Sequence, residues 1–173
     1  MTRPSPSTGK VPEPSNQNLV GRIVAIQLDE CTVVRRSPEV EHERAVAIYD
    51  LIEENMFTPL GVDASEFELH LGIQENRLYL DIRDLGGATL DRVTMSITPF
   101  RGIVRDYFLI CESYYDAIKR LAPSQIEAID MGRRGLHDDG ARMLMERLVG
   151  KVVMDFKTAR RLFTLICVLQ IRG

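Results

Sequence analysis

Apolar and polar residues alternate in three successive stretches in the middle of the chain. These stretches are FELHLGI (67–73), RLYLDIRD (77–84) and DRVTMSITP (91–99). A period of two residues places one face of a strand on a core and the other face in water. The connections QEN and LGGAT have hairpin length, and the second holds glycines that tight turns use. The pattern predicts a three-strand antiparallel meander, which a β-rich stretch at 21–29 can join.

The apolar spacing becomes helical after Pro99. Apolar residues between 100 and 121 recur every three to four positions, with charged residues between them, which predicts a long amphipathic helix. Ser37 and Pro38 carry the residue types of a helix start, and that helix is expected to run to about Asn55. The stretch at 162–171 is apolar on nearly every side, which is typical of a buried helix.

This order of elements predicts an α+β fold. The expected architecture is an antiparallel sheet of three to four strands, a meander, with helices packed on one face. Residues 20–173 are expected to form a single globular domain. Residues 1–19 contain four prolines and little apolar surface, so we expect a flexible Pro-rich tail.

Charge and cysteine content narrow the function classes. The net charge is −3, so nucleic acid and membranes are not expected partners. The residues from Ser124 onward, however, include nine Lys/Arg and six Asp/Glu, whereas the preceding residues include thirteen Lys/Arg and nineteen Asp/Glu. The excess of basic residues in this C-terminal third favours an anionic ligand, although a charge difference of this size is also typical of solvated surface. Three widely spaced cysteines without a CxxC motif indicate reduced thiols in a cytoplasm and no cysteine metal site.

The stretch DMGRRGLHDDGARML (130–144) concentrates glycine and charge. A capping box at Ser124 and Glu127 predicts a helix start, and Gly132 or Gly135 would end that helix. An acidic residue or histidine would then cap the next helix, so a corner between two helices is the favoured interpretation. An anion- or partner-binding surface and a catalytic role remain alternatives. The candidate binding residues are Arg133, Arg134, His137, Asp138, Asp139 and Arg142.

Glu39 and His42 are weaker candidates for a site. HERAV begins like the zinc motif HExxH, but Val46 stands where the second histidine is required. Glu39 and His42 also form an ExxH pair, and a di-iron site needs a second such pair that the sequence lacks. A solvated helix end is the simpler interpretation. We therefore predict no metal and no cofactor, and we interpret Cys111, which lies on an apolar helical stripe, as a buried residue.

Three long phrases resemble a known protein family. They are SPEVEHERAVAIYDLIEEN, ITPFRGIVRDYFLICESYYDAIKRLAPSQIEAIDMGRRGLHDDGA and DFKTARRLFTLICVL, in this order. The chain from about Arg22 to Gly173 is similar to a family of small uncharacterised alphaproteobacterial proteins catalogued only under a UPF number. The resemblance implies a soluble bacterial protein, and it supplies no catalytic residues.

Two functions follow as hypotheses. The first is a non-enzymatic cytoplasmic domain that binds a macromolecular partner or an anionic ligand. The alternative is an enzyme acting on a phosphorylated or carboxylated small molecule, in which Arg133 or Arg134 binds the anion and His137 transfers protons with a neighbouring aspartate. A concave pocket joining His137 to Glu41, His42 or a tyrosine would favour the enzyme, and a flat exposed loop would favour binding. Weak homodimerisation through the helix at 100–121 is a further hypothesis.

Overall fold

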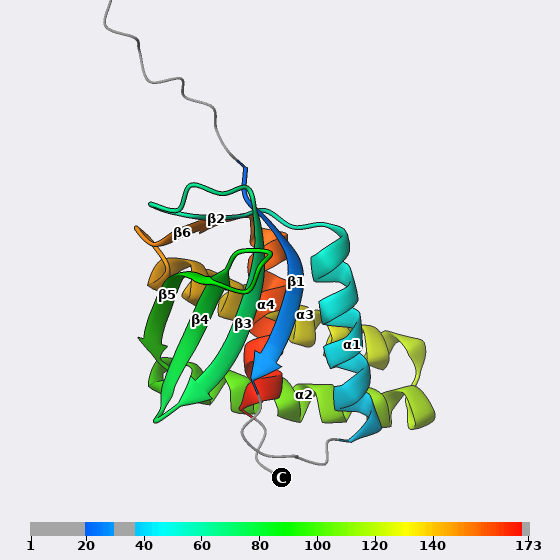
Figure 1. Cartoon of the computed structure of the whole chain (residues 1–173). Coiled ribbons are helices and arrows are strands. Elements are labelled where there is room, and N and C mark those ends of the chain that lie inside the picture. The colour runs from blue at the N-terminus through cyan, green and yellow to red at the C-terminus, as the bar shows by residue number, and fades with distance from the viewer. Residues whose placement is uncertain (1–19, 30–36, 171–173) are drawn as a thin grey trace, which may run out of the picture.

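The computed structural model describes residues 20–29 and 37–170, and it has the predicted α+β architecture (Figure 1). A four-stranded sheet has the order β1-β3-β4-β5. Its strands are β1 (Arg22–Asp29), β3 (Glu66–Gln74), β4 (Arg77–Arg83) and β5 (Thr89–Ser96). The three later strands pair antiparallel as the predicted meander.

The first strand pairs with β3 in parallel, so the sheet is mixed. A helix, α1 (Pro38–Glu53), lies between these two strands in the chain. A helical crossover returns the chain in the same direction, which makes parallel pairing possible. The helix starts as predicted, because the Ser37 hydroxyl accepts a hydrogen bond from the Val40 N–H at 3.3 Å.

Three further helices cover one face of the sheet (Figure 1). They are α2 (Arg101–Arg120), which follows a short 3-10 turn η1 (Thr98–Phe100), α3 (Pro123–Arg147) and α4 (Phe156–Leu169). As predicted, α4 is buried and α2 is amphipathic. The buried side of α2, which includes Val104, Tyr107 and Cys111, belongs to the core of this chain, so that surface is already covered.

A small second sheet pairs a strand that follows α1 with a strand that lies between α3 and α4 in the chain. Its strands are β6 (Val152–Met154) and β2 (Phe57–Pro59), which pair antiparallel. Among the described residues, no helix combines the length and the apolar character that crossing a membrane requires.

The predicted corner at 130–144 is wrong, because α3 is one unbroken helix from Pro123 to Arg147. The helix begins one residue before the predicted Ser124, with Ala122 as N-cap and with the Gln125 side chain accepting a hydrogen bond from the Ala122 N–H at 3.2 Å. Tertiary packing explains one glycine directly. Gly140 is buried, and a Cβ atom there would collide with the ring of Phe163 in α4. Close helix packing, and not a turn, therefore requires this glycine.

Gly135 provides a test of the unbroken helix. Nothing lies within 4 Å of a Cβ atom built on this exposed residue. Because alanine favours a helix interior by roughly 1 kcal/mol over glycine, we expect Gly135→Ala to raise the free energy of urea unfolding by about that amount. Gly140→Ala is the matched comparison, and it should lower the unfolding free energy because Phe163 must move. Destabilisation by Gly135→Ala would instead indicate a turn at this position.

Candidate functional site

The six candidate residues of α3 point in different directions because the stretch is helical. Arg133 points toward α1 and α2. Its guanidinium lies 2.8 Å from Asp130 and 3.3 Å from Glu43 of α1, and 4.7 Å from the ring centre of Tyr114 in α2. Glu43 also accepts a hydrogen bond from the Tyr115 hydroxyl at 2.7 Å. These contacts connect three helices, so Arg133 has a structural role.

The electrostatics of Arg133 agree with that role. Its side chain is 22% exposed, and those of Glu43 and Asp130 are 19% and 18% exposed. Burial acts to lower the pKa of Arg133, but the hydrogen bond with Asp130 and the charges of Glu43 and Asp130 outweigh it and raise that pKa. The charge of Arg133 is therefore already balanced within the chain.

Three other candidates lie on the solvated side of α3. Arg134 is 69% exposed and pairs with Asp130 at 3.0 Å. Arg142 and Asp139 are both more than half exposed and pair with each other at 3.1 Å. Ion pairs of this kind at the surface contribute little to stability. The structure does not bring these residues together with His137 in one site.

His137 points toward α4 and is half-buried. Its Nε2 atom lies 2.9 Å from the Thr164 hydroxyl oxygen, and its ring stacks on Tyr107 with 4.8 Å between the ring centres. Burial, together with the charges of Arg160 and Arg133, lowers the pKa of His137 to about 4. The imidazole is consequently neutral at neutral pH.

A cavity of about 250 Å³ lies between α1, α3 and α4 beside His137. In its lining, α4 contributes three cationic side chains and α1 contributes two carboxylates. We call it the basic cavity, because the cations outnumber the carboxylates. Its lining residues are Glu43, Val46, Ala47, Asp50, His137, Lys157, Arg160, Arg161 and Thr164. The candidate Asp138 lies beside this cavity and pairs with the Nε atom of Arg160 at 3.1 Å.

The cations of the basic cavity are only partly balanced by protein groups. Arg161 lies 4.0 Å from Asp50, and its buried Nη1 atom has no hydrogen-bond acceptor among the described residues. Lys157 is exposed and has no ion-pair partner within residues 20–29 and 37–170. An anion that enters the cavity would meet the Lys157 ammonium, a charged donor that the described residues leave without an ion pair.

The weaker candidates Glu39 and His42 lie in the first turns of α1, and His42 is exposed. Neither lines the basic cavity, although their neighbour Glu43 does. Within the described part of the chain, no group of three His, Cys, Asp or Glu residues is placed to hold a metal ion. Cys111 is buried as predicted, and burial raises its pKa to about 11, whereas Cys31 lies outside the described residues.

The cations of α4 were not among the predicted site residues. The signal was present, because Lys157, Arg160, Arg161 and Thr164 follow the spacing i, i+3, i+4, i+7. Residues at this spacing share one face of a helix. The residues that follow are apolar on nearly every side, so the stretch as a whole predicts a buried helix and not a polar face. The acidic partners Glu43 and Asp50 lie more than 100 residues away in the sequence, so no local pattern could predict them.

The chain belongs to UPF0262, which is described as an uncharacterised protein family and whose profile matches residues 20–172. A UPF0262 protein of Rhodopseudomonas palustris strain TIE-1 is 58% identical over 162 residues, which cover 94% of this chain and 98% of the relative. Relatives from Nitrobacter winogradskyi and Bradyrhizobium diazoefficiens are 57% and 58% identical over 92% and 95% of this chain, and over 96% and 99% of their own lengths. No solved structure matches the chain. The predicted resemblance to an alphaproteobacterial UPF family is thus confirmed.

Proposed function

We propose that this protein is a cytoplasmic, non-enzymatic domain that binds a small anionic ligand in the basic cavity. The observation that carries the proposal is the polar face of α4, on which Lys157, Arg160 and Arg161 line one cavity. Arginine and lysine at this spacing share one face of the helix and give the cavity several charge-assisted donors. The free Cys111 and Cys167 thiols support a reducing compartment such as the cytoplasm.

The size of the cavity restricts the ligand. At about 250 Å³, it is smaller than the 300–1,000 Å³ that is typical of sites for drug-sized molecules. A phosphate, a pyrophosphate or a short dicarboxylate matches this size, and its charge would pair with the three cations, which outnumber the two carboxylates in the lining by one. The neutral His137 and the hydroxyl of Thr164 would add hydrogen bonds that do not depend on charge.

The same contacts do not support the enzyme hypothesis. His137 stacks on a tyrosine, as we expected for an enzyme, although that tyrosine does not line the cavity. However, Tyr107 is only 1% exposed, and burial raises the pKa of its hydroxyl far above neutrality, while the pKa of His137 is about 4. Efficient proton transfer requires a pKa near the working pH. Arg133 and Asp138, moreover, are paired within the chain.

Titration with inorganic pyrophosphate tests the proposal. We expect saturable binding by calorimetry and an increase in the melting temperature, because a ligand of the native state stabilises that state. Lys157→Gln should weaken binding about tenfold or more, since it removes one charge-assisted contact. Lys151→Gln is the matched control, because Lys151 is exposed and does not line the cavity. Equal effects of the two variants, or no saturable binding at millimolar pyrophosphate, would refute the proposal.

A further inference from the structure

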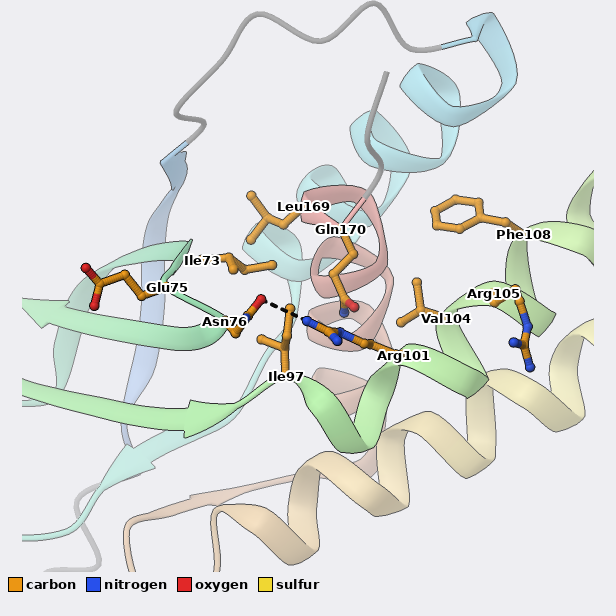
Figure 2. Close-up of a pocket in the computed structure, with 10 residues that line it drawn as sticks. All are labelled: Ile73, Glu75, Asn76, Ile97, Arg101, Val104, Arg105, Phe108, Leu169 and Gln170. Atoms are coloured by element: carbon orange, nitrogen blue, oxygen red, sulfur yellow. Dashed lines mark hydrogen bonds between the residues drawn. The ribbon is translucent and has the colours of Figure 1, made fainter.

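A second and larger cavity, of about 720 Å³, lies near the C-terminal end of α4. It is formed where the turn between β3 and β4, the start of α2 and the end of α4 meet (Figure 2). From its lining we infer that this cavity binds an amphipathic carboxylate, a molecule with one carboxylate group and an apolar chain or ring. We call it the amphipathic cavity. Its volume lies within the range that is typical of small-molecule sites.

Five of the ten residues that line the amphipathic cavity are apolar. Ile73, Phe108 and Leu169 pack against the edge of the hydrophobic core and stay partly exposed, while Ile97 and Val104 are core residues whose surface reaches the cavity. An apolar chain that covers these side chains would remove further apolar surface from water, which is favourable in proportion to the area buried. The basic cavity offers only Val46 and Ala47 for such contacts.

Two arginines of α2 supply the charge. Arg101 and Arg105 are four residues apart, so they share one face of the helix. Arg101 donates a hydrogen bond to the Asn76 side-chain oxygen at 2.8 Å, a neutral partner that holds the guanidinium without balancing its charge. Arg105 has one ion pair, with Asp106 at 3.7 Å, and both of these side chains are more than half exposed.

Glu75 is the one acidic residue among those that line the amphipathic cavity. Figure 2 shows its carboxylate pointing away from Arg101 and Arg105. The charge inside the cavity is therefore positive beside an apolar wall. A carboxylate matches the two-pronged donor geometry of arginine, and the apolar remainder of the same molecule would contact the wall. A purely inorganic anion would leave the apolar wall unused.

Octanoate is a suitable probe, with octanol as the neutral molecule of the same chain length. We expect saturable octanoate binding, detected through the methyl NMR signals of Ile73, Ile97 and Leu169, with no change at Val46 in the basic cavity. Octanol should bind at least tenfold more weakly, because it lacks the charge that the arginines recognise. Affinity should rise roughly fourfold for each methylene group added between hexanoate and octanoate.

Arg105→Gln is the variant that tests the charge contact, and it should weaken octanoate binding about tenfold. Arg120→Gln is the matched control, because Arg120 is exposed at the far end of the same helix, roughly 22 Å away at 1.5 Å per residue. The variants should share one urea unfolding midpoint, which confirms that the fold is intact. Equal affinity for octanol, equal loss in both variants, or methyl shifts confined to other parts of the molecule would each overturn the inference. Pyrophosphate binding in the basic cavity is measured separately, so the two proposals can fail independently.

Discussion

Acidification from pH 7 to pH 4 is expected to remove about 2–3 kcal/mol of unfolding free energy through His137 alone. The folded state holds the imidazole neutral because burial lowers its pKa to about 4, from the ordinary value of 6.5 in the unfolded chain. Between these two values the unfolded state binds more protons, so stability falls as the pH falls through this window. Above pH 6.5 the histidine is neutral in both states and has no effect. Below pH 4 both states are protonated, and the loss is complete.

Urea unfolding at pH 7 and pH 4 measures this effect in the wild type and in His137→Gln. Other groups also titrate in this range, so the informative quantity is the difference between the two proteins in their loss of stability. His137→Gln should lose about 2–3 kcal/mol less than the wild type over this range. His42→Gln, which alters an exposed histidine of α1, serves as control and should behave like the wild type. The same acid sensitivity in His137→Gln and the wild type would contradict the buried neutral imidazole.

Two adjacent arginines should differ greatly in their effect on stability. Replacing Arg133 by methionine keeps an apolar side chain, but it leaves Glu43 without its cation in a mostly buried position and leaves Asp130 with only the exposed Arg134 as partner. Removing one partner of a fully buried ion pair costs about 3–5 kcal/mol, so we expect about 2 kcal/mol for these groups, which are about one-fifth exposed. Arg134→Met, by contrast, removes one exposed ion pair and should change the unfolding free energy by less than about 0.5 kcal/mol.

Chemical denaturation of both variants checks this contrast, and a double-mutant cycle of Arg133→Met with Glu43→Gln isolates the contact between α1 and α3. A coupling energy near zero, together with equal destabilisation by the two methionine variants, would show that Arg133 does not connect the helices.

The difference between Arg133 and Arg134 also affects how binding partners are to be tested. Charge reversal at Arg133 would destabilise the fold, so a lost interaction in that variant would carry no information about a binding surface.

The sequence predicted those parts of the fold that local patterns encode. The period of two residues identified the meander, and the helical spacing identified α2 and α4, because each pattern reports a face that is buried within one element. The interruption of α3 was wrongly predicted because Gly132 and Gly135 resemble helix ends locally. The need for glycine at position 140 arises from its contact with Phe163, which lies 23 positions later in the chain. No local pattern shows that contact.

The candidate site was predicted only in part for the same reason. Of the six residues of α3, His137 lines the basic cavity and Asp138 lies beside it, while Arg133 has a structural role and the other three are solvated. The unbroken helix causes this separation, because successive residues of a helix point in different directions. The cations of Lys157 and Arg161 come from another helix, and only the packing of α4 against α1 and α3 brings them to His137.

Anion binding beside His137 is tested most directly by the imidazole NMR signals of the histidines during a pyrophosphate titration. We predict that the signals of His137 shift and reach saturation as pyrophosphate is added. The signals of His70, which lies in β3 with its Nδ1 atom 3.5 Å from Asp29, should stay in place. An unchanged His137 at saturating pyrophosphate, or equal shifts of both histidines, would contradict a binding site in the basic cavity.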